Sequence, residues 1–325
     1  MKPIVAIVAG GDSSEWQVSL RSAAGLNEFI DSERYQKYLV TIVGTTWQVE
    51  LPSGEKYPID KNDFSFVMNG EKVKFDFAYI TIHGTPGENG ILQGYFDLIG
   101  LPYSCCGVLA ASLTFDKYTC NQYLKSFGVN VADSVWLHRG DAVDVAKIVE
   151  QVGLPCFVKP CDGGSSFGVT KVKNANELPL AIEKAFAEGN EVMVEALMTG
   201  TEVTCGMYRT REKEVVFPIT EVVTANEFFD YDAKYNGQVE EITPARLPDE
   251  WTENIQNQTR KIYSALNAKG IIRVDYIVEE SGKINLLEVN TTPGMTVTSF
   301  IPQQVRAAGL DIRDVMSNII ENELR

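Results

Sequence analysis

Apolar runs alternate with polar, glycine-containing stretches along the first hundred residues. The runs at 4–9, 38–43 and 77–82 predict buried strands, and the spacing of apolar residues at 18–29 predicts a helix. Strands that alternate with helices in this way are typical of an α/β layer built on a parallel sheet. Because open parallel sheets bind ligands beyond the carboxyl ends of their strands, the polar loops after these runs are candidate binding loops.

The pattern becomes richer in short strands in the middle of the chain. The segment 87–100 predicts a loop and a helix, 101–103 a short strand, and 110–127 a single helix. Further strands are predicted at 154–160, 169–172, 191–195, 202–208 and 214–219. Further helices are predicted at 177–188, 251–266 and 301–323. The polar stretch 224–243 has no regular period and is long for a connector, which favours a lid or a disordered segment.

Two β-rich runs near the carboxyl end, at 271–278 and 284–290, predict a hairpin with its turn at 281–282. Side chains alternate between the faces of a strand, so the register of this turn decides which residues share a face. The pairs expected together on one face are Asp275 with Glu288 and Arg273 with Asn290.

Apolar residues are expected on both faces of this hairpin, which is typical of covered strands. Ile277, Ile284 and Leu286 are predicted on the face of the acids, and Val274, Tyr276, Val278, Leu287 and Val289 on the other face. Like charges directly opposite each other are unfavourable by roughly 0.2 to 1 kcal/mol, and a cation would resolve the conflict. Carboxylate and amide oxygens suit Mg²⁺ that shares a substrate's phosphates, although a solvated acidic face is the simpler alternative. The predicted metal ligands are Asp275, Glu288 and Asn290.

Composition narrows the classes of partner. The chain has 325 residues, a length that suits two or three domains, and a net charge of −15, which repels a nucleic-acid backbone. No stretch approaches the roughly 18 apolar residues of a membrane span. Six cysteines without a Cys-x-x-Cys spacing, and no secretion signal, favour reduced thiols in a cytoplasmic protein.

A glycine- and serine-rich loop at 161–168 follows a predicted strand that ends with Lys159. Backbone amides in such a loop can approach phosphate oxygens, and the lysine supplies positive charge; an ordinary hairpin turn is the alternative. A Walker A motif is absent, and the lysine precedes the glycines, opposite to the order in protein kinases. The stretch 195–202 has acids at both ends and suits an adenine and ribose, or a plain β-turn. Aromatic residues and a lysine at 228–235 favour a lid that closes over an anion.

A lysine, an acid and a histidine elsewhere in the chain each allow more than one interpretation. Lys117 either contacts a phosphate or is simply a solvated lysine on a helix. The loop 10–15 lacks the Gly-x-Gly-x-x-Gly pattern of a dinucleotide site, and its polar residues can cap the following helix. Glu15 is a candidate ligand for a substrate ammonium group. His83 ends a strand and has either a structural or a site-lining role, whereas His138 is expected at the surface.

Taken in order over essentially the whole chain, these segments resemble the ATP-grasp superfamily and, within it, the D-alanine:D-alanine ligases. The matching segments are 10–15 with 18–19, 83–84 with 87–90 and 93–94, 116–117, 159–160 with 164–168, 230–235, 273–275, and 288–291 with 293–294. The resemblance implies a mixed α/β and α+β fold. Its expected parts are an amino-terminal Rossmann-like parallel-sheet domain at 1–104 and a two-part ATP-grasp domain, with a central subdomain at 105–195 and a carboxyl-terminal subdomain with lid and metal site at 196–325.

The resemblance also implies roles at the nucleotide. Asp275, Glu288 and Asn290 would hold two Mg²⁺ ions, with Mn²⁺ as an alternative, against the ATP phosphates. The residues implied at the phosphates are Lys117, Lys159, Ser166 and Lys234, and those implied at the adenosine are Glu195, Met198 and Glu202.

Roles at the amino acids follow from the same resemblance. Glu15 would bind the first D-alanine's ammonium group and form a hydrogen-bonded trio with Ser165 and Tyr235, and His83 would lie close to this substrate. Arg273 and the Gly294 amide would stabilise a tetrahedral oxyanion. Ser299 would hold the carboxylate of the second D-alanine, beside Phe300.

The implied reaction is ATP-dependent ligation of two D-alanines through an acyl phosphate, for peptidoglycan precursor synthesis, by a cytoplasmic homodimer. The chain departs from the common pattern at Asn89, Cys161 and Phe300, and Phe300 can reshape the pocket for the second amino acid. Tyr235 argues against lactate as second substrate, whereas D-serine stays open. Two competing hypotheses are a different carboxylate:amine ligase and a nucleotide sensor without turnover.

Overall fold

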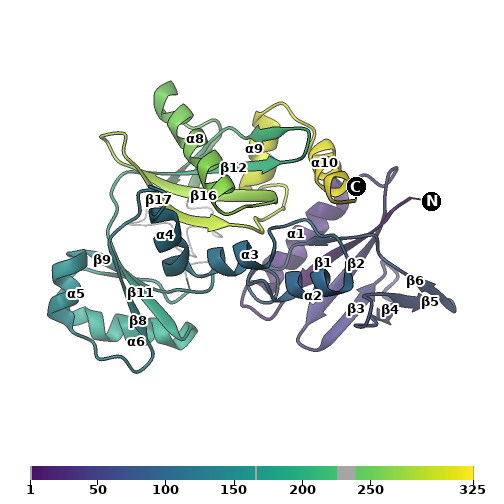
Figure 1. Cartoon of the computed structure of the whole chain (residues 1–325), viewed down its shortest axis with the longest axis horizontal. Helices are drawn as coiled ribbons and strands as arrows, with labels where there is room; N and C mark the ends of the chain where they lie inside the picture. The colour runs from purple at the N-terminus through teal and green to yellow at the C-terminus, as the bar shows by residue number, and fades with distance from the viewer. Residues whose placement is uncertain (1, 165–166, 225–238, 325) are drawn as a thin grey trace.

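The fold contains three main sheets, shown in a computed structural model that describes residues 2–164, 167–224 and 239–324 (Figure 1). The first sheet has the order β4-β3-β2-β1-β7, in which β2, β1 and β7 are parallel and β3 and β4 are antiparallel additions. The elements of this first region are β1 (Ile4–Gly10), α1 (Trp16–Phe29), β2 (Gln36–Val43), β3 (Thr46–Glu50), β4 (Lys56–Pro58), β5 (Phe66–Met68), β6 (Glu71–Val73), β7 (Phe77–Ile80), α2 (Ile91–Ile99), α3 (Val108–Phe115) and α4 (Lys117–Lys125).

The second sheet is antiparallel and has the order β10-β9-β11-β8. Its elements are β8 (Ser134–His138), α5 (Val145–Val152), β9 (Cys156–Pro160), β10 (Thr170–Val172), the 3₁₀ turn η1 (Ala175–Glu177), α6 (Leu178–Glu188) and β11 (Glu191–Ala196). Helices α5 and α6 cover one face of this sheet and share its apolar core.

The third sheet has the order β15-β14-β12-β16-β17, with β13 paired to β12. Its elements are β12 (Thr201–Arg209), β13 (Glu214–Val216), β14 (Thr220–Thr224), β15 (Val239–Ile242), α8 (Asp249–Ala265), β16 (Gly270–Val278), β17 (Ile284–Asn290), α9 (Phe300–Ala307) and α10 (Ile312–Leu324). No described helix has both the length and the apolar character that crossing a membrane would require. The mixed α/β and α+β architecture predicted from sequence is confirmed, while the domain boundaries at 104 and 195 stay a prediction.

Strand β1 shows why the first sheet lies between two cores. Val5 and Ile7 belong to one core and Ala6 and Val8 to the core on the opposite face, so every position of this run from Val5 to Ala9 is buried. The first of these cores also contains residues of β12, α9 and α10. The amino-terminal sheet and the carboxyl-terminal helices are therefore packed against each other, and the loops at their junction face a common cavity.

The predicted helix at 110–127 is wrong in one respect, because the structure divides it at Asp116. This residue is extended, and its carboxylate accepts a hydrogen bond of 2.6 Å from the Thr119 backbone N–H. Aspartate is a favoured residue at the first position before a helix, where it satisfies a free backbone donor. A new helix thus begins with Lys117, which the break directs toward the junction of the sheets.

The hairpin register is confirmed at the acids and wrong beyond them. Arg273 pairs with Asn290 and Asp275 with Glu288, but the register shifts between Asp275 and Tyr276. A bulge places two residues of one strand against one residue of the other, so the residues of β17 between the bulge and the turn lie on the opposite face from the one predicted. Leu286 and Ile284 accordingly pack in the core of Tyr276 and Val278, and Leu287 lies on the face of the acids.

Other differences concern short elements. The predicted strand at 101–103 is only a bridge between Tyr103 and Ala78, and the predicted strand at 214–219 forms only over its first part, as β13. The strands β3 to β6, β8, β14 and β15 and the helix α5 were not predicted. His138 lies on β8 with an exposed side chain, as expected.

Candidate active site

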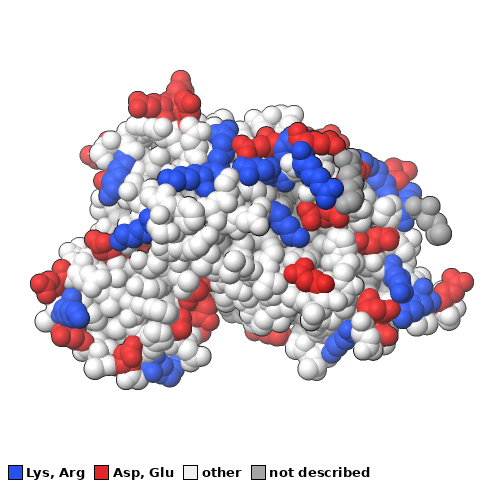
Figure 2. Space-filling model, viewed as in Figure 1, with Lys and Arg blue, Asp and Glu red and all other residues white. Residues whose placement is uncertain are grey.

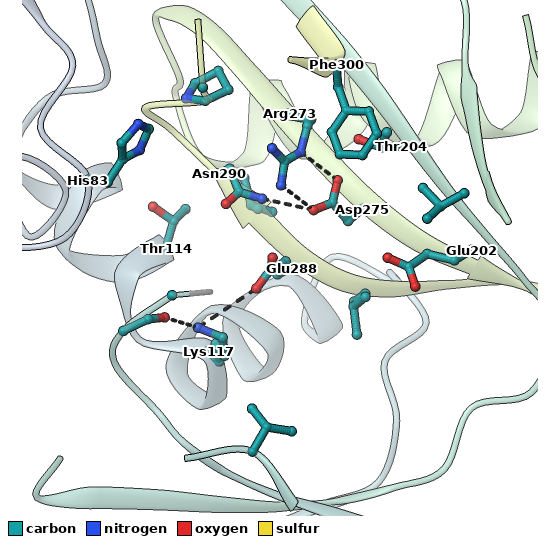
Figure 3. Close-up of a pocket in the computed structure, with 18 of the residues that line it drawn as sticks. His83, Thr114, Lys117, Glu202, Thr204, Arg273, Asp275, Glu288, Asn290 and Phe300 are labelled. Atoms are coloured by element: carbon teal, nitrogen blue, oxygen red, sulfur yellow. Dashed lines mark hydrogen bonds and ion pairs between the residues drawn. The ribbon is translucent and has the colours of Figure 1, made fainter. Parts of the chain in front are cut away.

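A cavity of about 1100 Å³ lies where the three sheets meet. Every candidate site residue that the structure describes contributes to its wall: Glu15, His83, Lys117, Lys159, Glu195, Met198, Glu202, Arg273, Asp275, Glu288, Asn290, Gly294, Ser299 and Phe300. Figure 3 shows how part of this set converges from β16, β17 and the first turn of α4. The candidates Ser165, Ser166, Lys234 and Tyr235 lie outside the described residues.

The acids of the hairpin sit within a network of hydrogen bonds. Arg273 donates to both carboxylate oxygens of Asp275, at 2.9 Å from Nε and 2.7 Å from Nη2, and the Asn290 amide donates to the same carboxylate at 3.0 Å. Burial alone would lower the pKa of Arg273, but the charge of Asp275, its hydrogen bonds and the charge of Glu288 outweigh that effect and raise the pKa, since the acids favour the charged guanidinium. The face predicted from the register is thus formed, with Asp275 buried and Arg273, Glu288 and Asn290 partly buried.

This group of residues fits a hard divalent cation. Two carboxylates and one amide offer only oxygen atoms as ligands, which is the donor set that Mg²⁺ prefers. A carboxylate has about four lone-pair sites, so Asp275 keeps acceptor capacity after three hydrogen bonds. Because the Asn290 amide nitrogen faces Asp275, its oxygen is turned away from that carboxylate (Figure 3).

Lys117 joins the metal-ligand candidates to the glycine-rich loop. Its Nζ lies 3.8 Å from Glu288 Oε2 and donates a hydrogen bond of 2.6 Å to the Gly163 carbonyl. The backbone of the same lysine donates to the Cys161 carbonyl at 2.9 Å. The start of α4 is therefore bound to the loop at both the main chain and the side chain, and a positive charge faces Glu288.

A buried ion pair holds the nucleotide candidates on the second sheet. Lys159 Nζ donates to Glu195 Oε2 at 2.7 Å, and both residues are almost inaccessible to solvent, with 7% and 1% exposure. They lie on the adjacent strands β9 and β11, and Asn121 on α4 is within 3.5 Å of the other carboxylate oxygen. A fixed lysine at this point places one more positive charge in the wall of the cavity.

The amino-terminal loops approach the glycine-rich loop closely. A methyl group added at Gly164 would lie 2.4 Å from Glu15 Oε2, so a residue with a side chain cannot take this place unless Glu15 moves. Glu15 also acts electrostatically on His83, which is buried behind it. The first helix and the glycine-rich loop thus enclose one end of the cavity.

His83 belongs to a chain of contacts rather than to an isolated surface. Its Nε2 lies 3.3 Å from Ser22 Oγ, and Ser22 Oγ accepts a hydrogen bond of 3.2 Å from the Met295 backbone. Burial lowers the pKa of His83, with the charge of Glu15 opposing the shift. The imidazole is consequently neutral near pH 7, and it lines the cavity, which is one of the two roles predicted from sequence.

The loop 291–299 forms the wall next to Arg273. Ser299 Oγ accepts a hydrogen bond from the Thr296 backbone at 3.1 Å and lies 2.7 Å from Thr296 Oγ1. A methyl group on Gly294 would be 3.0 Å from Ser299 Oγ, so this loop brings both residues together. The Phe300 ring lies 5.3 Å from the Arg273 guanidinium, a cation–π contact, and α9 begins with this phenylalanine (Figure 3).

Sequence reasoning missed several residues of the wall: Arg21, Glu88, Thr114, Thr204, Glu221, Glu241 and Gln303. Glu88 is the most unusual of them. Its Oε2 accepts a hydrogen bond of 2.7 Å from the Gly84 backbone, while burial and the charge of Glu15 raise its pKa to about 8. Its place in the segment 87–90, which matched the family pattern, was the available signal.

The comparisons with known proteins agree over the whole length. The family described as D-ala D-ala ligase N-terminus matches residues 4–106, and the one described as D-ala D-ala ligase C-terminus matches residues 123–321. The D-alanine–D-alanine ligase of Bacteroides fragilis strain YCH46 is 66% identical over 323 residues, covering 99% of this chain and 100% of the relative. That of Porphyromonas gingivalis strain W83 is 58% identical and covers 99% and 98%.

Solved structures give the same result for the fold. The VanG D-Ala:D-Ser ligase from Enterococcus faecalis superposes with a TM-score of 0.87 at 31% identity, over 99% of this chain and 100% of that chain. The D-alanyl-alanine synthetase A from Vibrio cholerae has a TM-score of 0.89 at 26% identity, over 99% and 98%. The D-alanine–D-alanine ligase from Bacillus anthracis complexed with ATP has a TM-score of 0.78 at 27% identity, over 99% and 97%.

Proposed function

The chain belongs to the D-alanine–D-alanine ligase family, and from that premise we propose that it joins two D-alanine molecules with ATP to make a peptidoglycan precursor. The observation that carries the proposal is that an acid and amide cluster, Lys117, Lys159 and Arg273 line one cavity. A nucleotide sensor would require the phosphate-binding lysines alone. The arginine beside the acids adds the means to stabilise a reaction intermediate.

The first step activates a carboxylate, which otherwise resists nucleophiles. A carboxylate oxygen of the first D-alanine attacks the terminal phosphorus of ATP, and ADP leaves as an acyl phosphate forms. Lys117 and Lys159 would lower the charge repulsion around the phosphates, as both line the cavity. Asp275, Glu288 and Asn290 would hold two Mg²⁺ ions, which when bound neutralise phosphate charge. Glu195, Met198 and Glu202 would enclose the adenosine.

The second step forms the amide. The amino group of the second D-alanine attacks the acyl carbon, and phosphate leaves with the electron pair of the broken C–O bond. Arg273 directs two N–H groups at Asp275, so its remaining donors and the Gly294 amide are available to the developing oxyanion. Removing one such donor costs about 2.7 to 4 kcal/mol in other enzymes. Ser299 would bind the second carboxylate.

The first substrate would lie against the amino-terminal loops. Glu15 supplies a carboxylate for its ammonium group, and His83 lies next to Glu15 in a neutral form. The contributions of Ser165, Ser166, Lys234 and Tyr235 rest on the family resemblance alone. An acyl phosphate reacts with water, so a lid contributed by the segment around Tyr235 would have a chemical purpose.

Phe300 bears on the identity of the second amino acid. It stands where the resembling ligases more often carry leucine, and its ring contacts Arg273 beside Ser299. We propose D-alanine as the second substrate, in line with the similar ligases of Bacteroides fragilis and Porphyromonas gingivalis. D-serine is the competitor to test, because a similar structure is a D-Ala:D-Ser ligase.

We also propose a homodimer in the cytoplasm. Four large apolar side chains on α2 and α3 are exposed: Ile91, Leu98, Val108 and Leu109. The two helices contact one another, and the surface over α3 carries few charges (Figure 2). Such a patch suits a second copy of the chain. The six cysteines are free and buried, which is compatible with a reducing compartment.

Turnover separates the proposed ligase from a nucleotide sensor. The purified chain would be mixed with ATP, Mg²⁺ and D-alanine, alone or with D-serine or D-lactate, and phosphate and dipeptide would be quantified together. We expect equal amounts of phosphate and D-alanyl-D-alanine. When D-serine or D-lactate competes with D-alanine, D-alanyl-D-alanine should remain the main product. Binding of ATP without phosphate release for any D-amino acid would instead identify a sensor.

A further inference from the structure

A second group of metal-ligating side chains lies behind the glycine-rich loop, where the start of α4 meets β9 and β11. One carboxylate oxygen each of Asp116 and Glu191 and the sulfur of Cys161 all lie within 4.8 Å of one another. The backbone holds them in place, since the Lys117 N–H donates to the Cys161 carbonyl and the Cys161 N–H donates to the Glu191 carbonyl, both at 2.9 Å. Three separate elements therefore present one donor atom each to the same point.

The thiol of Cys161 has no hydrogen-bond partner within the described part of the chain and is completely buried, with 0% exposure. It faces the carboxyl groups of Asp116 and Glu191, which also lie within 4.8 Å of each other. Burial and the neighbouring Asp116 carboxyl raise the pKa of Glu191, because two adjacent carboxylates repel each other. A bound cation would give the sulfur a partner and would remove the repulsion between the two carboxylates.

We propose that Asp116, Cys161 and Glu191 form a binding site for a thiophilic divalent cation such as Zn²⁺. Zinc binds thiolate and carboxylate ligands together, whereas the oxygen-only set in the cavity favours Mg²⁺. Ligands of one zinc ion lie roughly 3 to 4 Å apart, so side-chain rotations that move each donor atom by about 1 Å would bring these donors into range. The imidazole of His138 is a further donor nearby, with its Nε2 3.6 Å from a Glu191 oxygen.

Binding would replace protons with the metal ion. The Cys161 thiol would release its proton to solvent and bind as thiolate, and the acids would bind in their ionised form. Asp116 and Glu191 are only partly buried, which gives the ion a path from solvent. An ion at this point would connect α4 with the beginning of the glycine-rich loop, next to Lys117. The site is separate from the proposed ligase chemistry and does not depend on it.

The test measures metal binding to the full chain while Mg²⁺ saturates the cavity. Zn²⁺ affinity would be obtained by competition with a chromophoric chelator, and Cd²⁺ would be added to follow the ultraviolet charge-transfer band of a metal–thiolate bond. We expect one ion per chain and a band for the wild type. The variants Cys161→Ser and Glu191→Gln should each weaken Zn²⁺ binding by roughly tenfold or more, since loss of even a supporting residue costs 10- to 100-fold.

The matched control is Cys156→Ser, a buried thiol on β9 that does not belong to the cluster. It should retain both the Zn²⁺ affinity and the Cd²⁺ band. Thermal melts with and without Zn²⁺ show whether each variant folds. If Cys161→Ser does not fold, Glu191→Gln still tests the proposal, because Glu191 is partly exposed and its substitution should leave the fold intact. Wild-type affinity in Glu191→Gln, or a Cd²⁺ band that persists in Cys161→Ser, would overturn the proposal.

Discussion

The buried pair of Lys159 and Glu195 gives a prediction whose size follows from the structure. At a separation of 2.7 Å the Coulomb attraction is about 6 kcal/mol with an effective dielectric constant of 20. Replacing Glu195 by glutamine keeps the shape but leaves the lysine charge buried without its counterion. Because breaking a buried pair costs about 3 to 5 kcal/mol, we expect Glu195→Gln to lower the free energy of unfolding by that amount.

The assay is urea denaturation without nucleotide, together with hydrogen exchange of the β9 and β11 amides. The matched experiment is the double variant Lys159→Met with Glu195→Leu, which removes both charges at similar volume. It should recover most of the lost stability, since an apolar pair often replaces a buried ion pair without loss. A loss below about 1 kcal/mol for Glu195→Gln would refute the reasoning, because that value is typical of solvent-screened pairs.

Three further predictions concern packing, pH and specificity. Gly25→Ala should destabilise the fold by about 2 kcal/mol or more in thermal melts, because its methyl group would lie 2.0 Å from the Met295 carbonyl, whereas Gly94→Ala, with a nearest contact of 3.7 Å in another helix, should be neutral or stabilising. The pKa of Glu88 is raised to about 8, so between about pH 4.5 and pH 8 the folded state holds a proton that the unfolded state has lost, and the stability contributed by this group falls as the pH rises. The melting temperature of Glu88→Gln should therefore increase relative to that of the wild type between pH 5 and pH 9. A difference in melting temperature that stays constant with pH would contradict the assignment. Phe300→Leu should raise the ratio of kcat/KM for D-serine to that for D-alanine by roughly tenfold, by opening the second subsite, and an unchanged product ratio in competition would contradict this role.

The sequence was most informative where one regular element decided the positions of several residues. A hairpin of fixed period brings Arg273, Asp275, Glu288 and Asn290 to one face, and the register at these residues was predicted correctly. The bulge beyond Asp275 could not be predicted, since a single extra residue leaves the apolar pattern of both strands almost unchanged. It matters for the site because it brings Leu287 to the cavity wall.

Contacts between distant segments were less accessible to sequence reasoning. Lys159 and Glu195 were both assigned to the nucleotide, but their mutual ion pair depends on strands 36 residues apart lying side by side. Glu88 entered only as part of a motif, because its raised pKa results from burial and from Glu15, which comes from another element. The break at Asp116 had a local signal, an aspartate that caps the helix beginning with Lys117.

The most direct measurement follows one oxygen atom. D-alanine labelled with ¹⁸O in both carboxylate oxygens would be incubated with the chain, ATP and Mg²⁺, and the released phosphate analysed by mass spectrometry. If a carboxylate oxygen attacks ATP, that oxygen leaves with the phosphate, so each phosphate should carry one ¹⁸O for each dipeptide formed. The variant Glu288→Gln, which removes a charge facing Lys117 at 3.8 Å, should release almost none. Dipeptide formed with unlabelled phosphate would contradict the account.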